Sequence, residues 1–216
     1  MANIRISDMT MKQAAEGFSL SFKEKIELAK LLDKLGVSVI ELEGMENPRV
    51  DSLQIKSIAT AVKTSVVAVP VSLHKESVQE VWNALQVAKN PRLQVVASVS
   101  AVQMEYLYHK KPDGMIAAIA QTVADCVAVC SDVEFVAEDA TRSDFAFLCK
   151  AVETAISAGA TTVTLCEYSD HGDASVDKEV LSSFKSYKSK LGSNQEIIWD
   201  ADDITIYDKD GNRVDN

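Results

Sequence analysis

Residues that could act as acids, bases or anion binders gather near the middle of the 216-residue sequence, in the stretch 133–144. Glu138, Asp139 and Arg142 follow directly after an apolar run there, with Asp144 close behind. Carboxylates at a strand end can transfer protons, and a guanidinium can hold a carboxylate. A structural interpretation is equally open, in which Glu138 and Arg142 form an ion pair and Ser143 or Asp144 caps the next helix.

Two further carboxylates, Asp200 and Asp202, stand at alternate positions near the end of another apolar run. Alternate residues of a strand point to the same side, so the two side chains could hold Mg²⁺ or Mn²⁺, which prefer oxygen ligands. They could equally be solvated acids beside Asp203.

His171 follows the run 162–166 and lies four residues after Glu167. A histidine beside a carboxylate is a candidate general base. The alternative is a loop histidine that lies next to the start of a helix.

Composition narrows the classes of function. The sequence has 22 basic and 32 acidic residues and a net charge of −10, which argues against phosphate-backbone binding. Without a run of about 20 apolar residues or a signal-peptide pattern at the start, we expect a cytoplasmic protein that binds neither nucleic acid nor membrane. The four cysteines lack zinc-type spacing and are expected to be reduced and packed in the core.

Short β-branched runs alternate with longer amphipathic segments along the chain, which is typical of βαβ units. Their continuous apolar character indicates strands that are buried on both faces, as in parallel sheets. The predicted strands are Ile4–Ser7, Val37–Leu42, Val66–Val71, Leu93–Val99, Val133–Ala137, Thr162–Cys166 and Glu196–Asp200.

Capping patterns support this division. Ser21 followed by Glu24 predicts a capping box at the start of a helix that runs to Leu35. Gly36 and Gly159 each stand between a helical segment and a strand, where a left-handed cap is expected. We expect one domain over residues 1–203 and an acidic tail or hairpin over 204–216.

Seven predicted βα units fit either an open doubly wound sheet or an α/β barrel, and periodicity does not choose between them. No G-x-G-x-x-G or G-x-x-x-x-G-K-[ST] pattern follows a strand, which disfavours those modes of nucleotide binding.

The stretch DVEFVAEDATRSDFAFLCKAVETAISAGATTVTL resembles the fifth and sixth strand region of the DRE-TIM metallolyases, the group of 2-isopropylmalate synthase, homocitrate synthase and HMG-CoA lyase. ISDMT, GFSLSFKEKIELAKLLDKLGVSVIELEG and the Met-Glu-Tyr at 104–106 are similar to further parts of that family. The resemblance covers nearly all of residues 3–200 and implies a TIM-type (β/α) barrel, here shortened to about seven βα units.

The resemblance also implies an activity. Family members use a divalent metal to polarise a 2-oxo acid and make or break a carbon–carbon bond beside an acyl-CoA carbonyl. When family roles are carried over by position, Lys12 is expected to stabilise an oxyanion. Glu138 is expected to serve as an acid, a base or a substrate anchor. Glu41, Arg142, Tyr168 and His171 are expected at the substrate, and Asp200 and Asp202 at an Mg²⁺ or Mn²⁺ ion.

Several positions depart from the family pattern. Lys12 stands for the family's Arg, Gln13 or a gap for a metal-ligating Asp, and Gln94 for a His. Glu167-Tyr168 stands for Asp-Thr, and Asp200-Ala201-Asp202 for His-x-His. A neutral amide is a weaker ligand than a carboxylate, and a lysine is a point charge rather than a bidentate fork.

Two functions therefore follow from the sequence. One is a condensing transferase or lyase with a degraded metal site, and the other is a catalytically inactive barrel retained for binding, regulation or assembly. No counterpart of the family's eighth strand precedes Asn216, so Ile204–Tyr207 or a second copy of the chain is expected to cover the sheet edge. A homodimer is expected in either case.

Overall fold

Seven parallel strands form the centre of the molecule, and each pairs with its neighbours in sequence order. This computed structural model describes residues 5–12, 20–166 and 196–200. The strands are β1 (Ser7–Asp8), β2 (Val39–Glu41), β3 (Val66–Val71), β4 (Pro91–Ser98), β5 (Val133–Glu138), β6 (Thr162–Cys166) and β7 (Glu196–Asp200). An unbroken order from β1 to β7 lacks the reversal that defines a doubly wound sheet, and so the chain follows the winding of a barrel.

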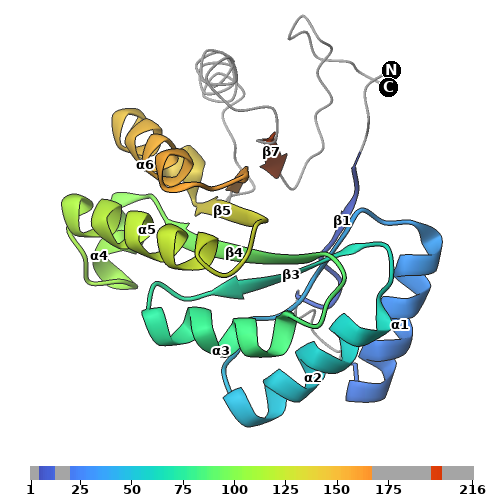
Figure 1. Ribbon diagram of the computed structural model, residues 1–216. Coiled ribbons are helices and arrows are strands. Elements are labelled where there is room, and N and C mark those ends of the chain that lie inside the picture. Colours follow the sequence, from blue (N-terminus) through green and yellow to red (C-terminus); the bar gives the residue numbers. More distant parts are fainter. Residues whose placement is uncertain (1–4, 13–19, 167–195, 201–216) are drawn as a thin grey trace, which may run out of the picture.

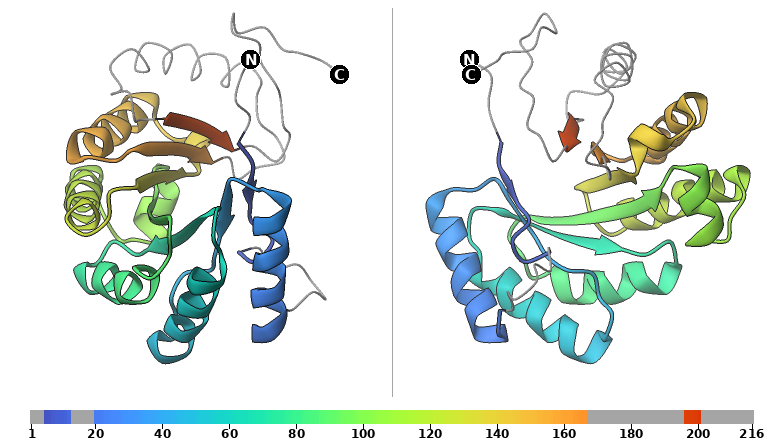
Figure 2. Two further views of the ribbon diagram at one scale, coloured as in Figure 1. Left: turned by 45° about the vertical axis from the view of Figure 1, so that its right-hand side comes forward. Right: turned by 180° about the vertical axis from the view of Figure 1, so that it is seen from behind.

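The helices lie along the outside of the curled sheet, as Figures 1 and 2 show. They are α1 (Phe22–Leu35), α2 (Pro48–Ala61), α3 (Lys75–Leu85), α4 (Ala101–Tyr106), α5 (Pro112–Val127), the 3₁₀ turn η1 (Ala140–Arg142) and α6 (Phe145–Ala158). None of the helices in the described part of the chain is long and apolar enough to cross a bilayer. The predicted barrel-type α/β fold is confirmed.

The seven predicted strands are all present, with the largest differences at the first two. β4 begins two residues before the predicted Leu93 and ends one residue before Val99, and β5 extends by one residue to Glu138. β1 begins at Ser7 rather than Ile4, and β2 is confined to Val39–Glu41. The ladder between them joins only Ser7 to Val39 and Asp8 to Ile40, so it is shorter than the apolar runs that predicted it.

Helix ends follow the predicted signals. Ser21 and Glu24 form the reciprocal capping box of α1, and Gly36 adopts a φ of 89° at its end. Gly159 ends α6 with a φ of 109°, where an added Cβ would lie 3.1 Å from Val127 Cγ2. Of the two residues expected to cap α6, Asp144 does so, and its Oδ1 accepts from the Phe147 N–H at 2.9 Å.

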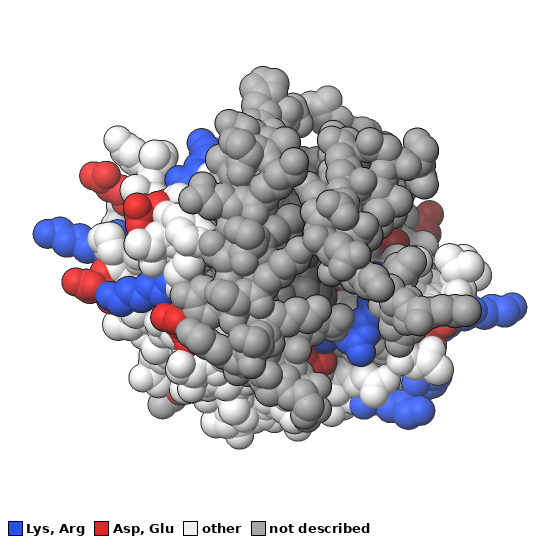
Figure 3. All heavy atoms as spheres, turned by 90° about the horizontal axis from the view of Figure 1, so that it is seen from above, with Lys and Arg blue, Asp and Glu red and all other residues white. Residues whose placement is uncertain are grey.

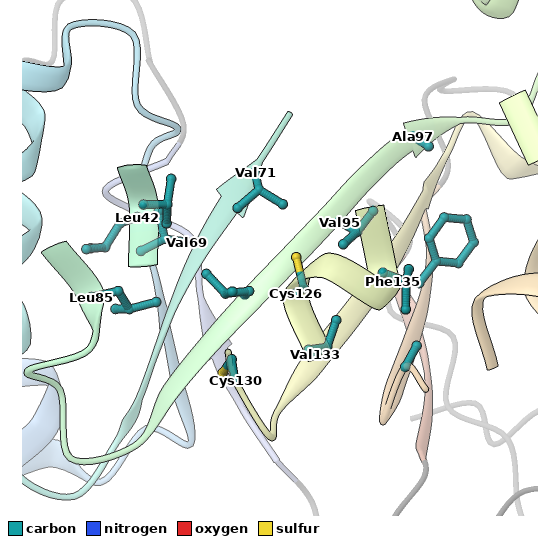
Figure 4. Close-up of a cluster of buried hydrophobic side chains, with 14 of the residues drawn as sticks. Leu42, Val69, Val71, Leu85, Val95, Ala97, Cys126, Cys130, Val133 and Phe135 are labelled. Atoms are coloured by element: carbon teal, nitrogen blue, oxygen red, sulfur yellow. The ribbon is translucent and has the colours of Figure 1, made fainter. Parts of the chain in front are cut away.

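The apolar core lies between the sheet and the surrounding helices. Alternate residues of β4 and β5, such as Val95 and Phe135, pack there with side chains from α3 and α5 (Figure 4). Cys126 and Cys130 belong to this layer, as predicted, whereas Cys149 and Cys166 are only half-buried; none of the four forms a disulfide. Burial, together with the nearby Cys130 and Asp125, raises the pKa of the Cys126 thiol to about 12.

Charges of both signs are mixed around the rim of the described surface that is visible in Figure 3. One carboxylate has a structural role. Asp33 of α1 accepts the backbone N–H groups of Lys63, Thr64 and Ser65 at 2.8, 2.9 and 2.8 Å, and the Thr64 hydroxyl at 2.6 Å. It thus fastens the turn that leads into β3.

We expect Asp33→Asn to lower the free energy of unfolding by about 1–2 kcal/mol, because the charged acceptor of four hydrogen bonds is lost at a partly exposed site. Partial burial would raise the pKa of Asp33, but the Thr64 hydroxyl and the three N–H groups outweigh it and hold that pKa well below its usual range. A lowered folded pKa gives stability that is complete above the unfolded value and is lost as the pH falls toward the folded one.

The measurement is urea unfolding at pH 7 and at pH 3. The deficit of the variant should shrink at pH 3, because the wild type then loses the same contribution. Glu27→Gln is the control, since its ion pair with Lys30 is exposed and worth at most about 0.5 kcal/mol. A deficit that is equal at both pH values would contradict this account.

Candidate functional site

Polar side chains line the face of the sheet that is turned away from the helices. Since Leu93 and Val95 pack toward the helices, Gln94 between them points to the opposite side. Gln94 pairs in register with Glu134, and the two side chains emerge on the same face. A sheet face of this kind is the interior of a barrel, where buried polar groups need partners.

Glu41 at the end of β2 holds the first part of this interior network. Its Oε1 accepts the Ser7 hydroxyl at 2.7 Å, and its Oε2 accepts Lys12 Nζ at 2.9 Å and Gln94 Nε2 at 3.0 Å. The side chains of Lys12 and Glu41 are 25% and 10% exposed. The structure therefore brings together Lys12 and Glu41, two of the residues predicted for the site.

The same amide group of Gln94 connects the contacts around Glu41 to a second set of contacts around Glu134. Nε2 also donates to Glu134 Oε2 at 3.0 Å, so it lies between two carboxylates. Glu134 accepts the Thr164 hydroxyl at 2.5 Å and Arg92 Nη1 at 3.5 Å. Arg92 in turn donates from Nε to both oxygens of Asp132, at 3.0 and 3.1 Å.

The protonation of Glu41 follows from these contacts. Burial alone would raise the pKa of its carboxyl, but the charge of Lys12 and the hydrogen bonds from Gln94 and Ser7 outweigh it. The pKa of Glu41 is therefore lowered, and the side chain is a carboxylate near neutral pH.

One acceptor in the network stays unsatisfied. Gln94 is 1% exposed, and its Oε1 has no hydrogen-bond partner among the described residues. A buried amide oxygen without a donor costs about 1–3 kcal/mol, which marks it as a place for a ligand or a water molecule to donate.

Glu138, the predicted acid or base, is the last residue of β5. Its Oε2 accepts the hydroxyl of Ser98, the last residue of β4, at 3.3 Å. Tyr108 hydrogen-bonds to the side chain and backbone of the same Ser98. Burial and, after it, the charge of Glu138 raise the pKa of the Tyr108 phenol, so the group keeps its proton at neutral pH.

The ion pair between Glu138 and Arg142, which was one of the two interpretations of this stretch, is wrong. Arg142 donates from Nε and Nη2 to both oxygens of Asp139, at 2.6 and 2.7 Å, and Ser100 also donates to Asp139. The cause is the backbone, because Asp139 has a φ of 58° and turns its carboxylate toward the turn that carries Arg142. A left-handed residue other than glycine at a strand end is characteristic of functional sites.

A cavity of about 370 Å³ opens beside these strand ends. The loop after β2, the end of β3 with its loop to α3, and Val96 of β4 line it, together with Tyr108 and Lys110. The volume suits a small metabolite, and the carboxyl ends of the strands are where α/β barrels bind substrates.

The remaining predicted residues are not placed. Tyr168, His171 and Asp202 lie outside the described residues, as do Gln13, Glu167 and the predicted tail. For Asp200 only the strand position is known, which is paired in register with Cys166.

The residues that the structure describes do not fit the divalent metal implied by the family resemblance. Within that part of the chain, no three His, Cys, Asp or Glu side chains gather where they could hold an ion. Glu41 and Glu134 are bound by the Gln94 amide and by cationic side chains, and Asp139 is bound by Arg142. An ion would have to displace these donors.

Sequence reasoning missed Ser98 and Tyr108. Ser98 lies one residue before the end of the predicted strand Leu93–Val99 and is the last residue of β4, so closeness to a strand end was the available signal for a site residue. Tyr108 carries no such signal, because it follows α4 in an irregular segment and approaches Ser98 only through the tertiary fold.

Comparisons with known proteins agree with this barrel-type fold. The HMGL-like family model matches residues 3–196, and the chain belongs to the HMGL-like family. The resemblance found in the sequence is thereby confirmed.

Curated relatives of this chain include 2-isopropylmalate synthases. The protein of Caulobacter sp. (strain K31) is 39% identical over 165 residues, which are 76% of this chain and 32% of that protein. The protein of Halalkalibacterium halodurans is 32% identical over 200 residues, which are 91% of this chain and 38% of that protein. This chain thus spans about a third of the length of the synthases that it matches.

Among solved structures, HMG-CoA lyase from Brucella melitensis aligns with a TM-score of 0.68 over 92% of this chain and 72% of that one. HMG-CoA lyase from Bacillus subtilis aligns with a TM-score of 0.65 over 88% of this chain and 64% of that one. Each is 13% identical to this chain, so these two likenesses concern the fold.

We expect Gln94→Leu to destabilise the protein by about 2–4 kcal/mol at pH 7, because two buried carboxylates lose a shared donor. Urea unfolding at pH 7 measures the deficit. Gln121→Leu, which removes one exposed bond to Asp125, should change stability by less than about 0.5 kcal/mol.

A second prediction concerns Tyr108. Glu138→Gln removes one cause of its raised pKa, so the phenol should ionise at lower pH than in the wild type, while burial continues to raise its pKa. Phenolate absorbance measured between about pH 8 and 12, with Tyr108→Phe subtracted, isolates this group. Glu105→Gln changes an exposed carboxylate on α4 and should have no effect. If Tyr108 titrates identically in Glu138→Gln and in the wild type, Glu138 does not influence the pKa of Tyr108 and the prediction is wrong.

Proposed function

We propose that this protein is a 2-isopropylmalate synthase-like enzyme that joins an acyl-CoA and a small 2-oxo acid at the carboxyl ends of its strands. The observation that carries the proposal is the position of Glu138. Its carboxylate lies at the end of β5, accepts from Ser98 and influences Tyr108, which lines the adjacent cavity. The synthases among the relatives support the reaction class.

Glu138 and Tyr108 offer the two proton-transfer roles that this condensation needs. Glu138 would take a proton from the carbon next to the thioester carbonyl, and that carbon would attack the keto carbon of the 2-oxo acid. The neutral Tyr108 would donate its proton to the keto oxygen as the new bond forms. Water then cleaves the thioester, so that a branched hydroxy diacid and the CoA thiol leave.

Cationic side chains suit the carboxylate of the 2-oxo acid. Lys12 uses one N–H group on Glu41 and has further donors to offer. Arg142 is anchored on Asp139 while its side chain stays 49% exposed. We assign anion binding to these two residues, with Tyr168 and His171 as predicted additions from beyond the described residues.

The test is release of thiol from acetyl-CoA in the presence of a panel of 2-oxo acids. Glu138→Gln should lower kcat by about 100-fold or more, because loss of a general base typically costs that much. Tyr108→Phe should lower it by a smaller factor. Glu80→Gln, an exposed carboxylate on α3, should leave it unchanged. Full activity in Glu138→Gln would refute the assignment.

A catalytically inactive barrel is the second candidate function. The specific observation in its favour is that the described carboxylates of the interior are bound by side chains of the protein itself. It predicts no thiol release from chelator-treated protein with or without added Mg²⁺ or Mn²⁺. In the first function, metal-dependent release that is lost in Asp200→Ala would instead place the ion at the predicted Asp200 and Asp202.

The remaining sequence-based expectations concern assembly and location. We propose a cytoplasmic homodimer, in keeping with β1 and β7, the outer strands of the described sheet, whose free edges a second copy could cover. Light scattering at micromolar concentration measures the mass, and a single monomeric species would overturn the dimer.

A further inference from the structure

The contact between Lys12 and Glu41 combines a nucleophile with a proton carrier on the inner side of the barrel. Lys12 Nζ lies 2.9 Å from Glu41 Oε2, and the lysine side chain is 25% exposed. The carboxylate is held in place by Ser7 and Gln94, so its position does not depend on the lysine alone. An amine that can hand a proton to a fixed carboxylate is equipped to attack a carbonyl carbon.

A second observation at the same place points to a ligand. The Gln94 Nε2 that contacts Glu41 leaves Gln94 Oε1 buried and without a donor in the described part of the chain. An O–H group bound near the Lys12–Glu41 pair would satisfy this oxygen. A keto compound that adds to an amine produces such a hydroxyl.

We propose that Lys12 forms an imine with a 2-oxo acid, so that the barrel has an activity that needs no metal. The choice of a 2-oxo acid as ligand rests on the proposed function. This activity differs from the condensation, in which the 2-oxo acid stays unattached and receives the new bond at its keto carbon.

The steps balance within the site. Glu41 takes one proton from the Lys12 ammonium, and the amine attacks the keto carbon to give a carbinolamine whose oxygen keeps a second proton of the nitrogen. Glu41 returns its proton to that hydroxyl, which leaves as water, and a protonated imine remains. The carboxylate then accepts a proton from the adjacent carbon to give an enamine. Return of a proton and addition of water restore Lys12 and the 2-oxo acid.

The consequence is exchange of the protons on the carbon next to the keto group. An enamine is nucleophilic at that carbon, so the site would also be competent for aldol addition to a second carbonyl compound. Exchange is the simplest outcome, because it needs no partner substrate.

The experiment treats the full chain with pyruvate and cyanoborohydride, which reduces an imine to a stable amine. Peptide mapping by mass spectrometry then locates the adduct, which we expect on Lys12. Lys12→Arg keeps the cation beside Glu41 and should abolish this adduct. Lys30→Arg is the matched control, because Lys30 also lies 2.9 Å from a carboxylate, that of Glu27, but on the open surface.

Exchange of the pyruvate methyl protons in D₂O, followed by NMR, is the second measurement. We expect the rate to fall by about 100-fold in Glu41→Gln, which removes the proton carrier, and to reach background in Lys12→Arg. Circular dichroism confirms that each variant is folded.

The results separate this inference from the proposed function. Label distributed equally over Lys12 and Lys30, or exchange that survives Lys12→Arg, would overturn the imine while leaving the condensation intact. An adduct on Lys12 in a protein that releases no thiol would support the imine and refute the condensation. An adduct with active condensation supports both.

Discussion

The Gln94 amide group is the contact on which the interior of this barrel depends. Its two N–H groups face Glu41 and Glu134, two carboxylates from different strands that would otherwise share a region of low dielectric. Burying a charge is costly unless it is paired and hydrogen-bonded. Lys12 and Arg92 supply the opposite charges, one at each end, so the amide joins two ion pairs into one chain of contacts.

This arrangement connects fold and chemistry. The apolar residues of β4 and β5 pack against the helices on one face of the sheet. Because side chains alternate along a strand, the residues between them point toward the interior of the barrel. The interior network fixes Glu41 and presents Lys12, whereas Ser98, Tyr108 and Glu138 gather farther along at the strand ends. The first group is joined by hydrogen bonds between strands, and the second reaches the cavity through Tyr108, which lines it.

Much of the fold could be predicted from the sequence, because it rests on local signals. The β-branched runs, the Ser21–Glu24 capping box and the glycines at 36 and 159 each depend on a few adjacent residues. Barrel winding needed the family resemblance, since periodicity is the same in an open sheet. The partner of Arg142 could not be predicted, because it depends on the φ of 58° at Asp139, a backbone feature that residue types alone do not reveal.

The candidate site was predicted only in part for a similar reason. Lys12, Glu41 and Glu138 were found by position in the family pattern, but their partners come from strands distant in sequence. Gln94 was read as the loss of a histidine, whereas in the folded protein it is a bridge between two carboxylates. A substitution that looks like the removal of one function can thus be the means by which buried charges are kept in place.

The sequential order of the strands has a further consequence for how the protein is made. Each strand pairs with the strands just before and after it in the chain, so a new strand finds its partner among residues synthesised shortly before. Loop closure over such spans is entropically cheap compared with the joining of distant ends. The sheet can therefore grow at the ribosome one βα unit at a time, with Asp33 securing the turn into the third strand before the fourth has emerged.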